Sequence, residues 1–466
     1  MVKRLLNEGF YTNIGIFPGV PVKCCGLRLA ITNGQTDDDI KNVLEAFHYH
    51  FPRVLEEENQ TVEDISQNFN MSFDATASRY AGLDAPAGRK GSLTVQHETT
   101  IERIDKELWN SLLADRGTFD WEGCRFIEQT FKNNPQPENN WNMHYLIIRD
   151  HESKPVLATF FSELMCKDDM IAPADVSRQI EDIRLNDRYH LTSKVVMLGS
   201  LLSLGEHLFL DRTSSDWKKA LLNMVRIMND VKRSSGATMI LLRDFNTDDI
   251  ELRDFLATEG FIRSDMFNDH VIDDLNWSTT EELIPRLSPK SRVHLRRNIL
   301  ANEPLFSVKV NGSIAESTVD QKYALYMQVK NRGFEMNTFE LPRKFFSNLG
   351  MFGGWEIIEL TLNESNHEGP VAFGIGYRSP GNNYIPLLIG LNYRFNETYG
   401  VYRQLLFQTV KRAADLKCNK LFFGFGADVE KRKFGTRLVH KSVYIQADDN
   451  YKFESLNKFQ QVNYAK

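Results

Sequence analysis

The sequence has few cysteines, no long apolar run and no excess of basic residues. Its five cysteines are Cys24, Cys25, Cys124, Cys166 and Cys418, and no two of them have the Cys-x-x-Cys spacing. This set supports neither a bound metal cluster nor a disulfide framework. No stretch approaches the roughly 18 apolar residues that span a bilayer, and no apolar core follows the early basic residues as in a signal peptide. A net charge of −6 argues against DNA as a partner. We therefore expect a cytoplasmic protein without a transmembrane segment.

The remaining composition is that of a globular protein. Of the 466 residues, 42% are hydrophobic and 25% are charged. At about 150 residues per domain, this length predicts two to four domains.

From residue 142 onward, the sequence pattern predicts strands and helices in an order that occurs twice. The first run gives antiparallel strands, a long helix and another strand, at 143–149, 155–164, 195–210, 216–231 and 238–243. The second run has the same order, at 355–362, 370–377, 383–391, 399–416 and 420–424. A helix over 288–300 joins the runs, with Ser288 as its N-cap and Pro289 at its first position. We expect an α/β (α+β) fold with two consecutive mixed-sheet units.

Two units of this order, joined by a Leu-Ser-x-Lys-x-Arg helix, are similar to the tandem GNAT-fold acyltransferases. Within these, the chain most resembles the BioF-like acetyltransferase group and the Fem-type aminoacyl transferases. The second unit carries the sharper resemblance, at 370–373, 389–396, 402–406 and 433–435. The resemblance implies an N-acyltransferase of the EC 2.3 class that moves an acyl group from a thioester, acyl-CoA, to a small-molecule amine. GNAT enzymes bind the coenzyme A pyrophosphate with a turn that has two glycines, whereas 392–402 offers one, Gly400.

Residues 5–46 carry a second resemblance, to the C-terminal end of the α-oxoamine synthases, which are PLP-dependent enzymes of the class II aminotransferase type. In that family, the arginine placed like Arg28 binds the substrate carboxylate. No residue before Met1 supplies the lysine that holds the cofactor, so we expect a remnant without bound PLP, or a truncated bifunctional enzyme. The resemblance also implies a partner: a PLP-dependent synthase, whose amino-ketone or sphingoid-like product would be the acceptor amine.

These patterns divide the chain into six expected segments. They are a synthase remnant at 1–51, a flexible linker at 52–95, a helical lead-in at 96–141, a first GNAT-like unit with the linking helix at 142–300, a second unit at 301–455 and a tail at 456–466.

Amine attack on a thioester needs a base with a pKa near neutrality and hydrogen-bond donors at the developing oxyanion. His207 ends an expected strand of the first unit, where a GNAT cleft would open. A packed, hydrogen-bonded histidine is the structural alternative. Glu163 is a second candidate base, and Asp169 is a third, from the loop that follows the same strand.

Five further residues are candidates for substrate binding. Lys167 and Asp168 share the loop with Asp169, where a solvated turn is the alternative. Tyr402 and Lys433 match hallmark positions of the resemblance.

Arg296 belongs to the basic linking helix, which carries Lys290, Arg292, His294 and Arg297 as well. These residues could bind phosphates of coenzyme A, of a phosphorylated acceptor or of tRNA. A solvated linker helix is the simpler interpretation.

Two other functions fit the sequence. An aminoacyl-tRNA-dependent Fem-type transferase is favoured by the basic helix and the single glycine of the turn, and disfavoured by the net charge of −6. A non-catalytic scaffold for a PLP-dependent synthase is the other.

Overall fold

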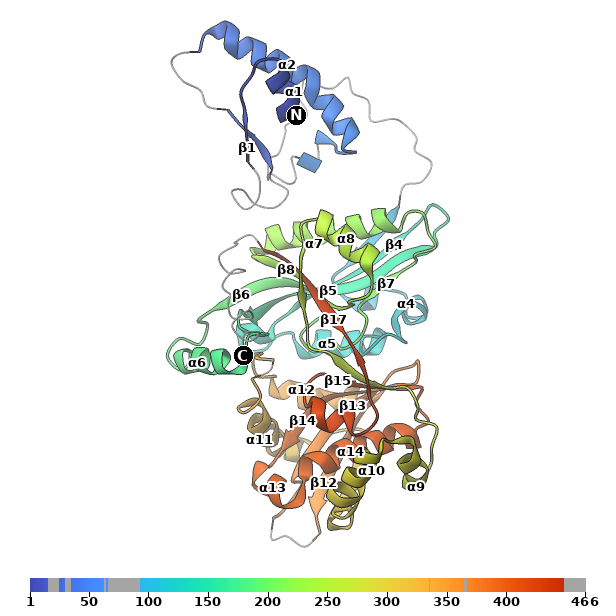
Figure 1. Ribbon diagram of the computed structural model, residues 1–466. Coiled ribbons are helices and arrows are strands. Elements are labelled where there is room, and N and C mark those ends of the chain that lie inside the picture. Colours follow the sequence, from blue (N-terminus) through green and yellow to red (C-terminus); the bar gives the residue numbers. More distant parts are fainter. Residues whose placement is uncertain are drawn as a thin grey trace. The chain divides into compact units, whose positions relative to one another are not determined.

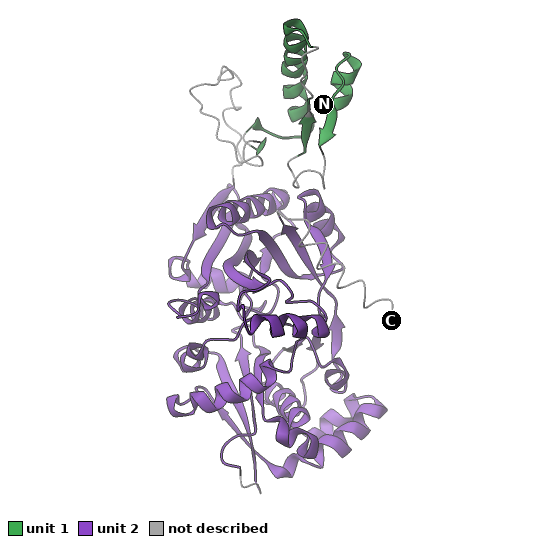
Figure 2. Cartoon of the chain, turned by 90° about the vertical axis from the view of Figure 1, so that its left-hand side faces the viewer, with its two compact units in different colours: residues 1–90, 448–451 green, residues 91–447, 452–466 purple. Residues whose placement is uncertain are grey.

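The computed structural model describes residues 1–15, 25–29, 35–62, 64–65, 93–334, 336–363 and 367–447. The described residues form two compact units, one within 1–90 and a main body within 91–447 (Figure 2). Of Arg28, only the backbone is described. Much of the expected linker, 66–92, and the whole expected tail lie outside the described residues.

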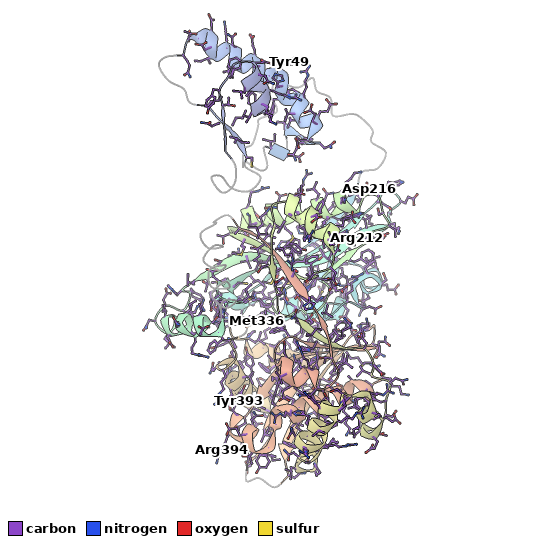
Figure 3. The ribbon with its side chains drawn as sticks, viewed as in Figure 1. Tyr49, Arg212, Asp216, Met336, Tyr393 and Arg394 are labelled. Carbon is purple, nitrogen blue, oxygen red and sulfur yellow. The ribbon has the colours of Figure 1, made fainter. Side chains whose placement is uncertain are left out.

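The N-terminal unit contains two helices and one strand pair. They are α1 (Val2–Asn7), β1 (Asn13–Gly15), β2 (Gly26–Arg28) and α2 (Asp37–Glu57), with β1 and β2 antiparallel. Helix α2 begins at a capping box in which the Thr36 hydroxyl accepts from the backbone N–H of Asp39, and the Asp39 carboxylate accepts from the backbone N–H of Thr36. The helix continues to Glu57, past the boundary expected at residue 51. Its apolar residues Ile40, Leu44 and Tyr49 are exposed (Tyr49 is labelled in Figure 3).

The main body contains two mixed sheets. The first has the order β3-β4-β5-β6-β8-β17-β9, with β7 also paired to β5. Its strands are β3 (Thr94–Glu98), β4 (Asn142–Arg149), β5 (Pro155–Lys167), β6 (Thr192–Leu198), β7 (Leu208–Leu210), β8 (Met239–Asn246), β9 (Ile262–Asp265) and β17 (Lys441–Ala447). The second has the order β11-β12-β13-β14-β15-β10-β16. Its strands are β10 (Asp269–Ile272), β11 (Phe306–Asn311), β12 (Trp355–Leu362), β13 (Ala372–Arg378), β14 (Asn383–Leu391), β15 (Lys420–Gly424) and β16 (Arg437–Val439). The expected mixed α/β fold with two sheets in tandem is confirmed.

The two sheets have equivalent strand orders, and each takes one strand from the other half of the chain. Strand β10 lies in sequence within the expected first unit, but it pairs with β15 and β16 of the second sheet. Strand β17 lies in sequence within the expected second unit, but it pairs with β8 and β9 of the first sheet. In Figure 1, the red strand β17 therefore lies among the strands of the green half. The expected boundary near residue 300 does not separate two independent sheets.

A long amphipathic helix covers a face of each sheet. In the first half, α7 (Trp217–Ser235) packs with α8 (Ile250–Thr258) over buried residues of β4, β5, β6 and β8. In the second half, α14 (Val401–Asp415) packs over β12, β13, β14 and β15, beside α10 (Pro289–Leu295) and the π-helical segment 296–300. As expected, the Ser288 hydroxyl caps α10 and Pro289 occupies its first turn. The other described helices include α4 (Lys106–Leu113), α5 (Trp121–Thr130), α6 (Ala174–Arg184), α9 (Thr280–Leu283), α11 (Val319–Lys330), α12 (Arg343–Asn348), α13 (Asn396–Tyr399) and α15 (Asp428–Arg432).

The residues between the two sheets form one shared core. Phe126 of α5 contacts Phe345 of α12 and Trp355 of β12, with ring centroids 5.5 Å and 4.8 Å away. The buried hydroxyl of Tyr377 in β13 donates to the Asp120 carboxylate at 2.6 Å. The segment expected as a helical lead-in, 96–141, therefore packs between the halves and joins them.

Candidate functional site

The second sheet opens between β14 and β15. The two strands pair in parallel at Asn383–Lys420 and Tyr384–Leu421, after which β15 continues beside β10. Beyond Tyr384, β14 has no partner strand on this side among the described residues. On its other side, Ile375 pairs with Leu388 and Gly376 pairs with Pro386, so Leu387 forms a one-residue bulge. A bulged residue is left out of the ladder and bends its strand, which here widens the opening.

A cavity of about 180 Å³ occupies this opening. Its walls are mostly apolar and come from β13, β14, β15 and α14, with Leu388, Tyr402, Leu405 and Phe425 among them. Leu204, from the first half of the chain, also lines the cavity. Of the expected binding residues, Tyr402 is the one that the structure places in this wall.

Lys431 supplies a buried positive charge to the same cavity. Its side chain lies in the wall, and its Nζ donates to the backbone carbonyls of Gly424 at 3.2 Å and Phe425 at 2.5 Å. Buried charges are costly unless they are paired, and they gather where function requires them. Sequence reasoning selected Lys433, which is half-buried just past the end of α15, instead of Lys431. The two lysines share one charge run, so only their burial distinguishes them.

The N-terminus of α14 lies among basic and polar residues. Gly400 precedes the helix with φ of 64°, a left-handed conformation that favours glycine. Arg403, in the first turn, donates to Glu430 at 3.0 Å, and His294 of α10 lies 3.1 Å from the same carboxylate. Asn302 donates to the carbonyl of Tyr399, which holds the end of the π-helical segment against this turn.

Arg296 is exposed on that π-helical segment, and Arg394 is exposed on the 3-10 helix Tyr393–Phe395 that precedes α13 and α14 (Arg394 is labelled in Figure 3). The helix dipole makes such a terminus favourable for phosphate groups, and the neighbouring guanidinium groups add positive charge, while the backbone N–H of Tyr402 donates to the Asn396 side chain.

The first sheet has a corresponding opening between β6 and β8, where the chain follows a different path. Strand β7 continues the line of β6 along β5, because Phe161 pairs with Leu198 and Thr159 pairs with Leu208. The segment 199–207 is therefore an excursion at the position where β14 has its one-residue bulge. Sequence analysis placed this segment within strands, which is wrong.

The excursion fills the inner part of its own opening. His207 is 2% exposed and stacks on Phe119 at 4.8 Å, and its Nε2 lies 2.8 Å from the Ser203 hydroxyl. Arg243 of β8 reaches into the same space and donates to the carbonyl of Ser200 at 2.6 Å.

Burial lowers the pKa of His207 to about 3, despite the nearby Asp244 carboxylate. The ring is therefore neutral and buried, which fits the packed histidine better than the expected base with a pKa near neutrality.

A cavity of about 190 Å³ lies at this opening, and His207, Arg243 and Asp244 are in its wall together with several charged side chains. Arg116 pairs with Glu206 at 3.3 Å, and Arg212 pairs with Asp249 at 2.5 Å (Arg212 is labelled in Figure 3). This cavity thus differs from the mostly apolar cavity of the second sheet by the charged side chains in its wall.

Glu163 also has a different environment from the one expected. Its carboxylate lies on β5 at 3.1 Å from both His144 Nε2 and Lys194 Nζ. Burial raises its pKa, but hydrogen bonds from His144 and Lys194 outweigh that effect and lower the pKa to about 2. A carboxylate with so low a pKa is a poor proton acceptor at neutral pH, so the structure argues against the expected role.

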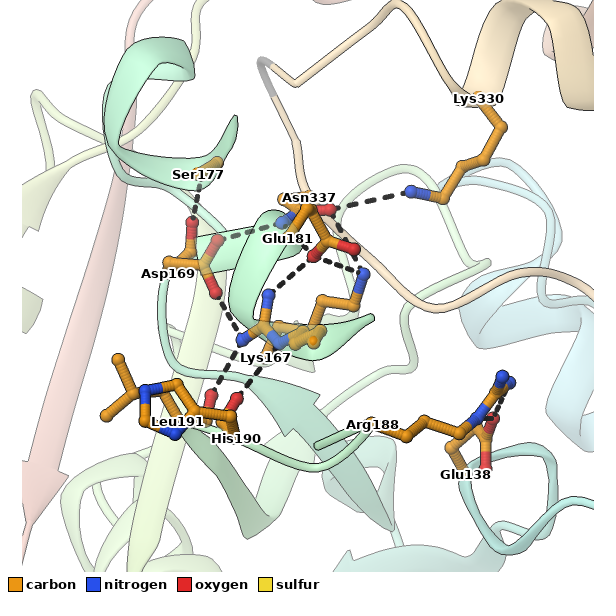
Figure 4. A network of polar contacts seen from close by, with 11 residues as sticks. Glu138, Lys167, Asp169, Ser177, Glu181, Arg188, His190, Leu191, Lys330 and Asn337 are labelled. Carbon is orange, nitrogen blue, oxygen red and sulfur yellow. Dashed lines mark hydrogen bonds and ion pairs between the residues drawn. The ribbon is translucent and has the colours of Figure 1, made fainter. Parts of the chain in front are cut away.

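The expected substrate loop belongs to a buried polar network that joins the two halves of the chain (Figure 4). Asp169 accepts from Arg184 at 2.6 Å and from Asn337 at 2.8 Å. Lys167 donates to Glu181 at 2.7 Å and to Asn337 at 3.2 Å. Because these side chains bind one another, the structure gives Lys167 and Asp169 a role in holding α6 against the segment after α11.

Asp168 is half-buried at the edge of this network, and its backbone N–H donates to the carbonyl of Leu191. Arg28 lies in the separate N-terminal unit, where its side chain is outside the described part.

Comparison with known proteins agrees with this geometry. Residues 289–432 match the family model of the acetyltransferase (GNAT) domain. The chain carries a GNAT acetyltransferase domain. The match runs from α10 to α15 and so includes the opening, α14 and Lys431. The protein is thus an acyltransferase of the EC 2.3 class. No curated protein matches the chain.

Among solved structures, the chain is similar to FemX at 10% identity, with 76% of this chain and 97% of FemX covered and a TM-score of 0.50. It also matches a tandem GNAT protein from the clavulanic acid biosynthesis pathway, at 11% identity, 77% and 99% coverage and a TM-score of 0.46. A third match is a GCN5-related N-acetyltransferase from Sphaerobacter thermophilus, at 8% identity, 76% and 96% coverage and a TM-score of 0.39. At these identities, the likeness to FemX is one of fold.

Two further observations concern membrane-spanning helices and metal-binding groups. None of the helices that the structure describes has the length and apolar character needed to cross a bilayer. Within the described ranges, no group of three or more His, Cys, Asp or Glu side chains is arranged to hold a metal ion.

Proposed function

We propose that the protein is an N-acyltransferase that binds acyl-CoA in the opening of the second sheet and transfers the acyl group to an amine. The observation that supports this assignment is the contrast between the two openings. The second contains an apolar cavity bounded by α14, whereas the cavity of the first is lined by charged side chains, with His207 and Arg243 held by hydrogen bonds in its wall.

The acyl-CoA donor would lie lengthwise in the opening between β14 and β15. Its phosphates would bind at the N-terminal turn of α14, where Arg403 and the exposed Arg296 add positive charge. Its pantetheine arm and acyl chain would follow the apolar wall between β14 and β15. This arrangement brings the thioester to the bulge at Leu387.

The chemistry follows from the groups at that point. The acceptor nitrogen attacks the thioester carbonyl, and negative charge develops on the carbonyl oxygen. The bulge leaves a backbone N–H of β14 out of the ladder and available to that oxygen. The Lys431 ammonium, in the wall of the same cavity, adds a positive charge.

The acceptor in this proposal is an amino ketone or sphingoid-like amine, delivered by a PLP-dependent synthase. The support for this part is the resemblance of residues 5–46 to the end of such a synthase. The exposed apolar residues Ile40, Leu44 and Tyr49 of α2 also favour contact with another protein.

The assay is release of free thiol from acyl-CoA by the purified protein in the presence of such an amine. Lys431→Met should lower kcat/KM by roughly 10²-fold, because it removes charge at the oxyanion. Lys433→Met is the matched control, because it removes a half-buried lysine of the same charge run and should leave the rate within about twofold. The proposal fails if no acyl-CoA and amine pair gives thiol release, or if both variants lose activity equally.

An aminoacyl-tRNA donor is the second candidate, because the exposed Arg296 lies on a basic segment beside α14. Amine-dependent loss of the aminoacyl group from charged tRNA, without turnover of acyl-CoA, would favour it over the first.

A further inference from the structure

Asp269 is the first residue of β10, the strand that the second sheet receives from the first half of the chain. His270, the next residue, pairs with Gly424 of β15, and Asp269 lies one position further along, toward Phe425. Gly424 and Phe425 both line the cavity in the opening. The strand exchange therefore places Asp269 at the strand position next to two residues that line the cavity, although Asp269 is not itself part of the lining.

The side chain of Asp269 is on the face of the sheet opposite α14. Ile272 pairs with Leu421, and both pack in the core under α14. Because side chains alternate along a strand, His270 shares that face, whereas Asp269 points to the other one. That other face is turned toward β8 and β17 of the first sheet, which supply charged neighbours of Asp269.

The groups around Asp269 come from three elements. They are Arg243 and Asp244 of β8, Lys441 of β17 and Lys431 of α15.

Each of these four groups has a partner of its own. Arg243 donates to the Asp244 carboxylate at 2.6 Å, and Lys441 donates to the carbonyl of Asp244 at 3.3 Å and to Asn246 at 3.0 Å. Lys431 donates to two backbone carbonyls.

The Asp269 carboxylate accepts no hydrogen bond from the side chains of the described residues. Burial raises the pKa of its carboxyl to about 6, and the Asp244 carboxylate raises it further against the opposing effect of Lys441, Arg243 and Lys431. A proton acceptor that works at neutral pH has a pKa close to this value.

We propose, on the basis of the proposed function, that Asp269 receives the proton of the acceptor ammonium at the inner end of the cavity between β14 and β15. The ammonium enters from the side of the first sheet and transfers one proton to a carboxylate oxygen of Asp269. The free amine then attacks the thioester carbonyl carbon, the C–N bond forms and the C–S bond breaks. The second amine proton leaves with the thiolate as free thiol, and Asp269 returns its proton to solvent.

The test compares Asp269→Asn with Asp273→Asn at saturating acyl-CoA. Asn keeps the size of the side chain and removes the proton acceptor, so kcat/KM for the amine should fall by about 10²–10⁴-fold at pH 7. Asp273 is an exposed residue just past the end of the same strand, paired with Arg437, and its variant should keep the wild-type rate. Asp269→Glu should restore part of the rate.

Two further readouts separate this role from a structural one. The acidic limb of the wild-type rate profile, with a midpoint near pH 6, should be absent in Asp269→Asn, and acyl-CoA affinity by calorimetry should be unchanged. Wild-type kinetics or an intact acidic limb in Asp269→Asn would overturn the inference while leaving the proposed function standing. Lost acyl-CoA binding in this variant would also overturn it, by showing a structural role. If the wild-type protein itself lacks thiol release, the proposed function fails, and this inference fails with it.

Discussion

Removal of β17 should unfold the first sheet, although this strand is encoded more than 170 residues after β9. A chain that ends at Val439 lacks the strand between β8 and β9, including the buried Val443, Tyr444 and Ile445. Each such side chain contributes about 1.5–3 kcal/mol by burial, so the three together contribute roughly 5–9 kcal/mol. That sum is comparable to the whole stability of a typical domain, about 5–15 kcal/mol.

The measurement is urea denaturation followed by circular dichroism, with hydrogen exchange at α7 as a local probe of the first sheet. Amides of α7 should lose their protection in the chain that ends at Val439, because α7 packs on the core that contains Tyr444. A chain that ends at Ala447 keeps the whole of β17 and is the control. Equal midpoints for the two chains and full protection of α7 would refute the strand exchange.

Three other predictions concern individual side chains. Leu204→Trp should shorten the preferred acyl chain in a donor panel, because this residue lines the cavity and its backbone is held by hydrogen bonds to Thr118. Arg403→Ala should raise KM for acyl-CoA by about tenfold and leave KM for acyl-pantetheine unchanged, because only the first donor carries the nucleotide phosphates. Glu163→Gln should destabilise the protein by roughly 1–2 kcal/mol at pH 7, as measured by urea denaturation. Because the pKa of Glu163 is lowered from 4.5 to about 2, its contribution is present above pH 4.5 and is lost as pH falls toward 2.

Each of these three predictions would be contradicted by a specific result. An unchanged chain-length profile in Leu204→Trp would place the acyl group elsewhere. An equal rise in KM for both donors would exclude Arg403 as a phosphate ligand. A stability difference for Glu163→Gln that persists at pH 2 would assign its effect to packing and not to charge.

Local patterns predicted much of the fold. Strands were expected at 355–362, 383–391 and 420–424, and β12, β14 and β15 have the same bounds. These segments are short apolar runs bounded by turn residues, for which sequence periodicity is informative. The exchange of β10 and β17 could not be predicted in this way, because a strand pattern does not specify which sheet receives the strand.

The candidate site residues were predicted less well than the strands, because segments distant in the sequence determine which of these side chains are buried. Tyr402 was selected because its position matched a family segment, and it lies in the cavity wall. His207 and Glu163 were chosen by residue type. Burial lowers the pKa of His207, and hydrogen bonds from neighbouring side chains lower the pKa of Glu163. Lys431 and Asp269, which the proposed mechanism uses, were not selected from the sequence, since the first is distinguished from Lys433 only by burial, and the second is placed in the second sheet only through strand exchange.

The central claim is that acyl-CoA binds in the opening of the second sheet and not in that of the first. Hydrogen exchange with and without a non-reactive acyl-CoA analogue tests it most directly. The account predicts added protection in peptides that cover 383–409, which span β14 and the N-terminal part of α14, and no change at 193–210 or 239–252. Protection at the first opening, with 383–409 unchanged, would contradict it.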